Sequence, residues 1–174
     1  MLPDFDLQKF LSQLPWGIPD DADADYMRDC RWMQLALFEA VGAFLDDEVP
    51  VGCVIIKDGK VLAKTRNRKE QMNNPTAHAE ILAITEAAAK LGSWRLEDCE
   101  VYVTLEPCSM CTGALLQARV KRLVYGARDS KAGAAGTLFS LHNDSRLNHK
   151  IETKAGCLED AAVFLLREFF KRKR

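Results

Sequence analysis

The stretch EVYVTLEPCSMCTGALLQARVKRLVYGA, residues 100–127, decides the fold of this 174-residue chain. It opens and closes with apolar segments, Glu100–Leu105 and Arg122–Ala127, that are typical of buried strands. Between them, Glu106-Pro107-Cys108 leads into a segment that we expect to be helical as far as about Arg119. Strands that alternate with helices in this way indicate a mostly parallel sheet covered by helices.

The alternation continues on both sides of this stretch. Apolar residues at helical spacing predict a helix over Tyr26–Leu45. Asp58-Gly59 is a strong hairpin signal, and we expect its two strands over Val49–Ile56 and Lys60–Lys64. The remaining predicted elements are a helix capped by Thr76 that ends near Leu91, a strand over Lys150–Lys154 and a helix over Leu158–Lys171. Residues 26–174 are therefore expected to form one three-layer α/β/α domain with a mixed, mostly parallel five-stranded sheet.

Residues 1–25 are predicted to be an acidic N-terminal appendage. They contain six aspartates and one lysine, a net charge of −5, and an amphipathic piece, Asp6–Leu14, that ends at Pro15. A set of apolar side chains in this appendage is expected to dock on the domain or on a partner subunit: Phe5, Phe10, Leu11, Leu14 and Trp16. A solvated tail is the alternative.

Composition restricts the function classes. The net charge of −1 argues by itself against a nucleic-acid partner, but five of the last eight residues are basic and Phe169-Phe170 stand beside them. Such an end either complements the dipole of a terminal helix or grips phosphates while a ring stacks on an unpaired base. The six cysteines are irregularly spaced and the start of the chain is acidic, and both features favour a cytoplasmic protein. No apolar run is long enough to predict a membrane segment.

A split pattern, His78-Ala79-Glu80 and Pro107-Cys108-Ser109-Met110-Cys111, carries the chemistry. One imidazole and two thiolates make three protein ligands, which is typical of a catalytic zinc site whose fourth position is left to water. Glu80 follows the histidine closely enough to carry protons to and from that water. The helices expected at His78 and Cys108 would direct their positive N-terminal ends at the metal.

The parts of this pattern also have ordinary explanations. A lone C-x-x-C pair is a redox pair or half of a structural zinc site. A structural site would need a fourth ligand, and the candidates are Cys30, Cys53, Cys99, Cys157, His142 and His149. Cys53 and Cys99 lie in or beside strand-like runs, where free cysteine behaves as a small hydrophobic residue. The joint occurrence of histidine, glutamate, proline and paired cysteines favours the catalytic site.

The H-x-E…P-C-x-x-C pattern is the established signature of zinc-dependent nucleobase deaminases. Further matches cover residues 48–52 (EVPVG), 67–68 (NR), 75–81 (PTAHAEI), 103–114 (VTLEPCSMCTGA), 126–136 (GARDSKAGAAG), 147–150 (LNHK) and 169–172 (FFKR). From about Tyr26 to Lys173 the chain resembles bacterial tRNA-specific adenosine deaminases of the TadA type, in the cytidine/deoxycytidylate deaminase superfamily. The resemblance implies a cytidine-deaminase-like fold, and residues 1–25 lie outside it.

The resemblance also implies roles for individual residues. His78, Cys108 and Cys111 would hold one zinc ion (Zn2+) per subunit. Glu80 would be catalytic, moving protons while water attacks C6 of adenine to give inosine. The implied substrate contacts are Asn67 on the flipped base, Val51 and Leu105 as pocket walls, Asp129 and Lys131 on anticodon nucleotides, and Phe170, Arg167, Lys171 and Arg172 on the RNA.

The implied function is zinc-dependent hydrolytic deamination of the wobble adenosine in a tRNA anticodon stem-loop. The family resemblance further implies a homodimer in which the helices around Cys108–Ala118 face the partner. The alternative is a free nucleobase or nucleoside deaminase of the guanine or cytidine type, since such an enzyme would use the same zinc ligands. It would not need the loop over residues 129–136. A non-catalytic zinc-binding assembly subunit is a third possibility, although such a protein could dispense with Glu80.

Overall fold

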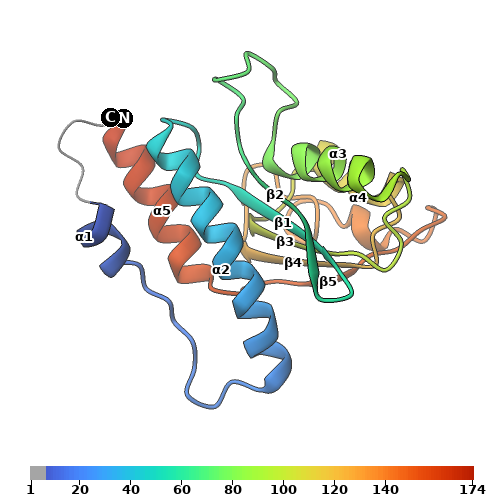
Figure 1. Cartoon of the computed structure of the whole chain (residues 1–174), viewed down its shortest axis with the longest axis horizontal. Coiled ribbons are helices and arrows are strands. Elements are labelled where there is room, and N and C mark those ends of the chain that lie inside the picture. Colours follow the sequence, from blue (N-terminus) through green and yellow to red (C-terminus); the bar gives the residue numbers. More distant parts are fainter. Residues whose placement is uncertain (1–6) are drawn as a thin grey trace.

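A five-stranded mixed sheet forms the centre of the protein (Figure 1). The computed structural model describes residues 7–174. The strands are β1 Gly52–Lys57, β2 Lys60–Arg66, β3 Glu100–Leu105, β4 Arg122–Ala127 and β5 Glu152–Lys154. The helices are α1 Leu7–Ser12, α2 Ala24–Leu45, α3 Ala79–Leu91, α4 Ser109–Gln117 and α5 Glu159–Arg172, with a short 3-10 turn, η1, over Leu141–Asn143.

The strands lie in the order β2-β1-β3-β4-β5. β1 pairs antiparallel with both β2 and β3, whereas β3 with β4 and β4 with β5 are parallel. Four strands therefore share one direction and β1 alone runs against them. This arrangement confirms the expected α/β class with a mixed sheet.

Alternate residues of the strands point into two cores, one on each face of the sheet. Val54, Tyr102 and Val124 belong to the core that α2 and α5 cover. Ile55 and Val103 belong to the other core, which contains α3 and α4. Figure 1 shows the resulting three layers, with α2 and α5 on one side of the sheet and α3 and α4 on the other. The second layer of helices carries the candidate site.

The hairpin between β1 and β2 is confirmed. Asp58 and Gly59 both have positive φ, at 49° and 68°, as a two-residue turn that matches the strand twist requires. β1 begins at Gly52 rather than at Val49, because Pro50 lacks an N–H group and interrupts the ladder. A Cβ on Gly52 would come within 2.0 Å of the Ala36 carbonyl oxygen, so glycine lets β1 pass directly against α2.

The start of α3 differs from the prediction. Thr76 is not the N-cap, because its hydroxyl donates instead to Asn74 Oδ1 at 2.8 Å within the preceding turn. The helix begins at Ala79, and His78 occupies the N-cap position. The imidazole itself therefore stands at the helix N-terminus.

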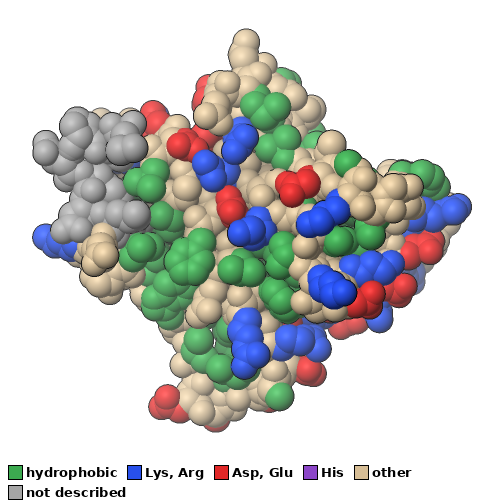
Figure 2. All heavy atoms as spheres, viewed as in Figure 1, with side chains coloured by type: hydrophobic (Ala, Val, Ile, Leu, Met, Phe, Trp, Pro, Cys, Tyr) green, Lys and Arg blue, Asp and Glu red, His purple; other side chains and the backbone are tan. Residues whose placement is uncertain are grey.

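The segment before α2 lies against the side of the domain formed by α2 and α5. Leu14 is only 4% exposed and belongs to that core, and Leu11 and Trp16 pack against it. Figure 2 shows hydrophobic side chains gathered over this side of the molecule. The expected docking of Leu11, Leu14 and Trp16 is thus confirmed, whereas Phe5 and the side chain of Phe10 lie outside the described residues. The division at residue 25 stays a prediction.

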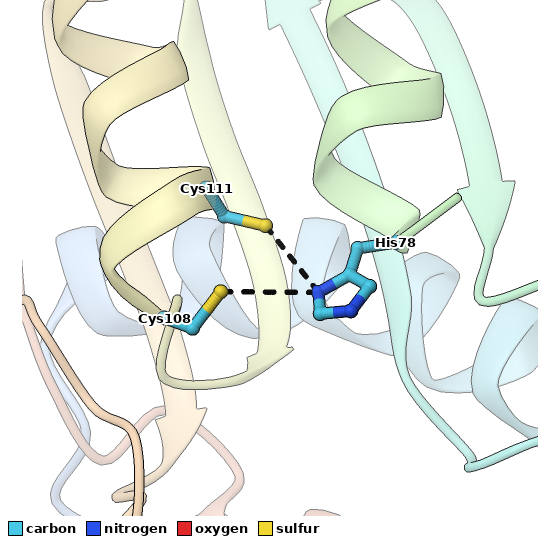
Figure 3. Close-up of side chains that lie close together, drawn as sticks. All are labelled: His78, Cys108 and Cys111. Carbon is cyan, nitrogen blue, oxygen red and sulfur yellow. Dashed lines mark hydrogen bonds between the residues drawn. The ribbon is translucent and has the colours of Figure 1, made fainter. Parts of the chain in front are cut away.

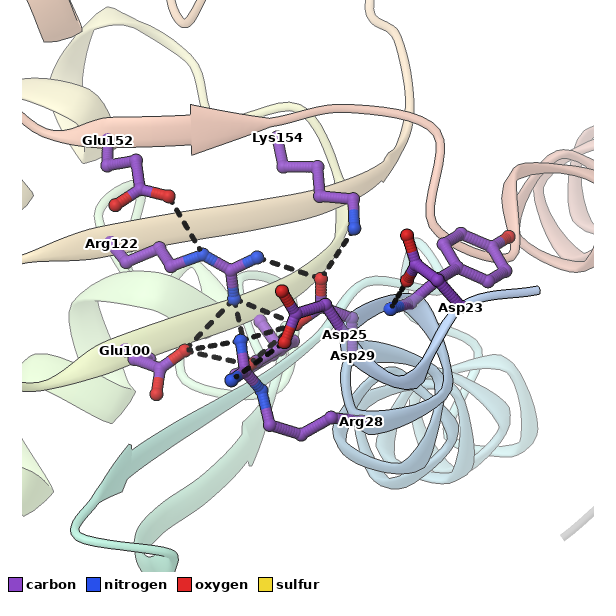
Figure 4. A network of polar contacts seen from close by, with 10 residues as sticks. Asp23, Asp25, Arg28, Asp29, Glu100, Arg122, Glu152 and Lys154 are labelled. Carbon is purple, nitrogen blue, oxygen red and sulfur yellow. Dashed lines mark hydrogen bonds and ion pairs between the residues drawn. The ribbon is translucent and has the colours of Figure 1, made fainter.

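A buried ion network ties α2 to the starts of β3 and β4 (Figure 4). Arg122 donates to both carboxylate oxygens of Asp29, at 2.7 and 2.8 Å, and Lys154 donates to the same carboxylate at 3.0 Å. Arg122 also reaches Glu100 at 3.0 Å, and the Tyr102 hydroxyl donates to Asp29. Burial would raise the pKa of Asp29, but the hydrogen bonds from Arg122 and Lys154 lower it to about 2.

All six cysteines carry free thiols. Five of them are buried, and Cys108 is half-buried. Within residues 7–174, no helix has the length and apolar character needed to cross a membrane.

Candidate active site

Three potential metal ligands meet between the N-termini of α3 and α4 (Figure 3). His78 Nδ1 lies 3.6 Å from Cys111 Sγ and 3.9 Å from Cys108 Sγ. The three ligand atoms all lie within 4.8 Å of one another. A tetrahedral zinc ion with ordinary Zn–S and Zn–N bonds separates its nitrogen and sulfur ligands by about 3.6 Å. The residues therefore fit a zinc ion at this point.

The local structure explains why these side chains converge. His78 is the N-cap of α3 and Cys108 is the N-cap of α4, both with extended backbone and neither with a side-chain capping hydrogen bond. Cys111 follows in the first turn of α4. The ligand atoms therefore turn toward one another, and the positive ends of both helices face them. The predicted convergence of two helix N-termini is confirmed.

The ligand group contains three residues and no fourth. Among residues 7–174, no further histidine, cysteine, aspartate or glutamate joins it. The fourth-ligand candidates lie elsewhere, and Cys53 and Cys99 are buried in the apolar core beneath α3, as expected. An open set of three ligands is typical of a catalytic metal site rather than a structural one.

The thiols and the imidazole influence one another. Hydrogen bonds with Cys111 and His78 lower the pKa of Cys108 to about 4, although its partial burial opposes this. The hydrogen bond with Cys108 raises the pKa of His78. The pKa of Cys111 is raised by its hydrogen bond with Cys108 and by burial. A bound cation would favour both thiolates, because metal ligands must be deprotonated.

Glu80 lies in the first turn of α3 and is 4% exposed. Burial raises the pKa of its carboxyl group above the ordinary value. Glu80 lines the same cavity as His78 and Cys108, where Lys69 is the one lysine or arginine among the described lining residues. The carboxyl group is thus placed to exchange protons with a molecule bound beside the ligands.

A cavity of about 180 Å³ opens beside the ligands, at the carboxyl end of β3. It brings together most of the residues that the sequence predicts: Val51, Asn67, His78, Glu80, Leu105, Cys108 and Asp129. Val49, Lys69, Ala79, Glu106 and Ala132 complete its wall. Cys111 is fully buried behind this wall. The cavity lies below the roughly 300–1,000 Å³ of common ligand pockets, so it suits a single flat ring system.

A buried carboxylate orients Asn67. Glu48 is 1% exposed and accepts hydrogen bonds from Asn67 Nδ2 at 3.0 Å and from the Gln71 backbone N–H at 2.7 Å. One N–H of the Asn67 amide is therefore committed to Glu48, and the carbonyl oxygen and second N–H are available to a ligand. Sequence reasoning assigns Glu48 no role, although this residue opens the EVPVG match.

Glu106 is a second buried carboxylate that sequence reasoning leaves without a role. It follows β3 directly, and it accepts hydrogen bonds from the backbone N–H groups of Asp129, Ala135 and Thr137 and from the Thr137 hydroxyl. Burial would raise the pKa of Glu106, but these hydrogen bonds lower it below the ordinary value. The GARDSKAGAAG stretch thus folds onto the residue that precedes Pro107 and Cys108.

Five implied substrate contacts lie outside the cavity: Lys131, Arg167, Phe170, Lys171 and Arg172. Lys131 is exposed, and its backbone N–H donates to Asp129 Oδ1 at 2.8 Å. Phe170 is 50% exposed and lines a separate hollow between the end of β4 and α5. This hollow also contains Arg128, Arg167, Lys171 and Arg174. Arg172 points elsewhere, since it donates to Asp47 at 2.9 Å and lies over the Phe44 ring.

The MafB19-like deaminase family matches residues 27–174. The tRNA-specific adenosine deaminase of Streptococcus pyogenes is 41% identical over 143 residues, which are 82% of this chain and 90% of that protein. The Aquifex aeolicus enzyme of the same name is 44% identical over 143 residues, or 82% of this chain and 94% of that protein. The Bacillus subtilis enzyme is 43% identical over 147 residues, or 84% and 91%.

The chain is also similar to solved structures of deaminases. A structure from studies of A-to-I editing by tRNA:A34 deaminases at the wobble position of transfer RNA is 42% identical, with a TM-score of 0.76. The match covers 78% of this chain and 99% of that one. A guanine deaminase from Nitrosomonas europaea is 29% identical with a TM-score of 0.66, covering 92% of this chain and 91% of that one.

Proposed function

The chain belongs to the deaminase family that includes the tRNA-specific adenosine deaminases, and from this premise we propose that it converts the wobble adenosine of a tRNA anticodon loop to inosine. Adenosine and water would give inosine and ammonia. The observation that carries the proposal is that Glu80, Asn67 and two members of the ligand group, His78 and Cys108, line one cavity. The identity of 41–44% to tRNA-specific enzymes supports this reading over a free-base deaminase.

We assign zinc to His78, Cys108 and Cys111. The 3.6 and 3.9 Å separations between the imidazole nitrogen and the two sulfur atoms support this assignment. Bound there, the ion would activate a water molecule as a nucleophile at neutral pH. The two helix N-termini would stabilise the thiolates that hold it.

Glu80 is the proposed proton carrier. Its position two residues after His78, on the wall of the cavity, places the carboxyl group beside both water and the bound ring. It would accept a proton from the attacking water and deliver it to a ring nitrogen of adenine. It would then take the remaining proton from the new hydroxyl group on C6 and give it to the amine, which leaves as ammonia. The other carboxyl groups on the cavity wall among the described residues, Glu106 and Asp129, accept hydrogen bonds from the loop over residues 129–137.

Three residues are proposed to hold the base. Val51 and Leu105 supply apolar walls for a flat ring, and the Asn67 amide, fixed by Glu48, supplies hydrogen bonds to its edge. A cavity of this size admits one base and not a base pair. The target must therefore leave its stack, and an anticodon loop offers an unpaired base at low cost.

Basic and aromatic side chains near the cavity support an RNA substrate. Arg128 lines the hollow that holds Phe170, and Asp129, the next residue, lines the cavity, so the two hollows adjoin. Arg167 and Lys171 would contact phosphates while Phe170 stacks on a neighbouring base. Lys131 would contact the anticodon from the exposed tip of its loop. A tRNA substrate also agrees with the proposed cytoplasmic location.

We further propose a homodimer that forms over α4. A shallow hollow beside α4 is lined by Gly113, Leu116, Leu141 and Leu147, and Leu147 is 42% exposed. The side chains of Leu138 and Phe139 are also exposed, by 50% and 57%. Sedimentation equilibrium should give twice the chain mass, and Leu147→Glu should shift the protein toward monomer. A wild-type monomer at micromolar concentration would contradict the dimer.

The decisive experiment is single-turnover deamination by the zinc-loaded protein. The substrate is an anticodon stem-loop with adenosine at the wobble position. The matched controls are the same stem-loop with its one adenosine moved into the stem, and free adenine, guanine and cytidine. Inosine formed only at the wobble position supports the proposal.

The other outcomes are equally informative. Turnover of a free base with the stem-loop untouched would keep the metal chemistry and replace the proposed substrate. Inertness toward every substrate, in protein that contains one zinc ion per chain, would favour a non-catalytic subunit.

A further inference from the structure

The buried carboxylate of Glu106 is compensated by neutral hydrogen-bond donors. Oε2 accepts from the Asp129 N–H at 3.1 Å and from the Thr137 hydroxyl, and Oε1 accepts from the N–H groups of Ala135 at 3.1 Å and Thr137 at 2.9 Å. Glu106 is 2% exposed, and among residues 7–174 no lysine or arginine pairs with it. Hydrogen bonds to an ionised acceptor are about twice as strong as neutral ones. One side chain therefore fixes both ends of the loop over residues 129–137.

The loop also packs against Glu106 without space to spare. A Cβ on Gly133 would lie 2.5 Å from Glu106 Oε2 and 2.6 Å from the Asp129 carbonyl oxygen. The Gly133 N–H donates to that carbonyl at 3.0 Å, and the Ala134 N–H donates to the Pro107 carbonyl oxygen at 2.9 Å. The loop is thus attached both to the carboxylate and to the backbone beside Cys108.

This attachment decides the shape of the cavity wall. Asp129 and Ala132 line the cavity, and Asp129 Oδ1 accepts from the N–H groups of Lys131 and Ala132 at 2.8 and 3.2 Å. The loop therefore has an internal turn of its own. Its distance from the ligand group is set by contacts outside the loop, namely the Ala134–Pro107 backbone hydrogen bond and the four hydrogen bonds to Glu106.

We propose that Glu106 is a positioning residue that holds the loop over residues 129–137 at the distance from the ligand group that substrate binding requires. Its carboxylate does not touch the reacting atoms. The inference rests on the proposed function, since it concerns the affinity for the adenosine-containing RNA. Its oxygens are occupied by loop donors, and no hydrogen bond joins them to His78, Glu80 or Cys108 in the described residues. Loss of the carboxylate should therefore weaken binding and spare the chemical step.

The first test is Glu106→Gln, measured on the zinc-loaded protein with the wobble stem-loop. The amide keeps the size but places an NH2 group against loop donors, so about one charge-assisted hydrogen bond or more is lost. We expect KM and the dissociation constant of the RNA to rise about 10- to 100-fold, while the saturating single-turnover rate changes less than about threefold. The zinc content should stay at one ion per chain.

The matched control is Glu100→Gln, the same change at the opposite end of β3. Glu100 bonds to Arg122 and Tyr102 and lies outside the cavity, so KM for the stem-loop should not change. Gly133→Ala attacks the same contact from the loop side and should raise KM as Glu106→Gln does. Together the two changes should raise KM less than the product of their separate effects, because they break one contact.

Amide hydrogen exchange gives a reading that does not depend on turnover. In RNA-free protein, Glu106→Gln should accelerate exchange at the amides of Asp129, Ala135 and Thr137 about tenfold or more, and Glu100→Gln should not. Unchanged exchange, or a fall in the saturating rate with unchanged KM, would overturn the positioning role. If the wild-type protein does not deaminate the stem-loop, the proposed function fails, and KM is compared on the base or nucleoside that the protein does convert. The exchange rates test whether Glu106 holds the loop in place in either case.

Discussion

The two ends of strand β3 both bury acidic groups, but they balance the charge in opposite ways. At the start of the strand, the buried Asp29 and the partly exposed Glu100 meet Arg122 and Lys154, so each carboxylate has a cation at 3.0 Å or less (Figure 4). Beyond the end of the strand, Glu106 has only neutral donors. Glu80 and the two cysteines nearby have no side-chain cation in ion-pair contact among the described residues.

The difference separates a structural polar cluster from a functional one. A buried charge without a partner costs several kcal/mol, and evolution retains such a cost where a ligand removes it. The compensated end is complete as it stands. Glu106 is satisfied by the donors of its loop, so the proposed cation would complete only the group formed by His78, Glu80 and the two cysteines. Removing that cation should affect this group and leave the other end of the strand intact.

Removal of the metal should give the largest effect. Dialysis against a chelator should abolish deamination of the stem-loop, and one equivalent of zinc should restore it, because the ion activates water. Far-UV circular dichroism should change little, since the Asp29 network and both cores do not involve the ligands. Full activity in protein shown by metal analysis to contain less than about a tenth of an ion per chain would refute the metal assignment.

Glu80→Gln should give the next largest effect. Loss of the proton carrier should lower the single-turnover rate about 10³-fold or more, while zinc remains bound. Denaturant unfolding should show equal or greater stability, because a buried carboxyl group without a cation is replaced by a neutral amide. A variant with more than about a tenth of the wild-type rate would remove Glu80 from its role.

Arg122→Met should produce the reverse pattern at the other end of the strand. It leaves Asp29 buried with Lys154 at 3.0 Å and Arg28 at 3.7 Å as its remaining cations, so the free energy of unfolding should fall by up to about 3–5 kcal/mol. The rate per folded molecule should change less than about twofold, because Arg122 lies outside the cavity. Arg146→Met is the matched control: its ion pair with Asp144 is exposed, and the expected loss is at most about 1 kcal/mol. Equal losses in the two variants would contradict the comparison.

Lowering the pH should weaken the same network, with a smaller loss in the free energy of unfolding than in Arg122→Met. The pKa of Asp29 is about 2 in the folded state and about 3.9 in an unfolded chain. Because the folded pKa is the lower one, the stabilisation of about 2–3 kcal/mol is complete above about pH 5 and is lost as the pH falls toward 2. In chelator-treated protein, Asp29→Asn should make the free energy of unfolding decline less steeply over this range. Parallel curves for the two proteins would show that Asp29 is not the responsible group.

Local sequence signals predict most of the framework. The predicted bounds of β3 and β4 agree with the structure, because each strand is a continuous apolar run that ends at a clear change in composition. The hairpin at Asp58-Gly59 follows from the backbone preferences of two residues. The convergence of His78, Cys108 and Cys111 is predictable because their spacing is characteristic and each stands at a helix start.

Contacts that depend on packing are not predictable in the same way. Arg122 and Asp29 are 93 positions apart, and nothing near either residue identifies the other as its partner. Glu106 lies inside the metal motif, yet its partners belong to a loop that begins 23 positions later. Thr76 shows the opposite error: it has the chemistry of a helix cap, but Asn74 captures its hydroxyl and the helix begins after it.

The Asp29 network also has a consequence for heat resistance. The hydration of charged groups becomes less favourable as temperature rises, so the cost of burying Asp29 and Arg122 falls on warming. The stabilisation from apolar burial levels off over the same range. The fraction of stability that comes from these few charges therefore grows as the protein approaches its melting temperature. The end of the sheet that takes no part in catalysis would then set the highest temperature at which catalysis continues.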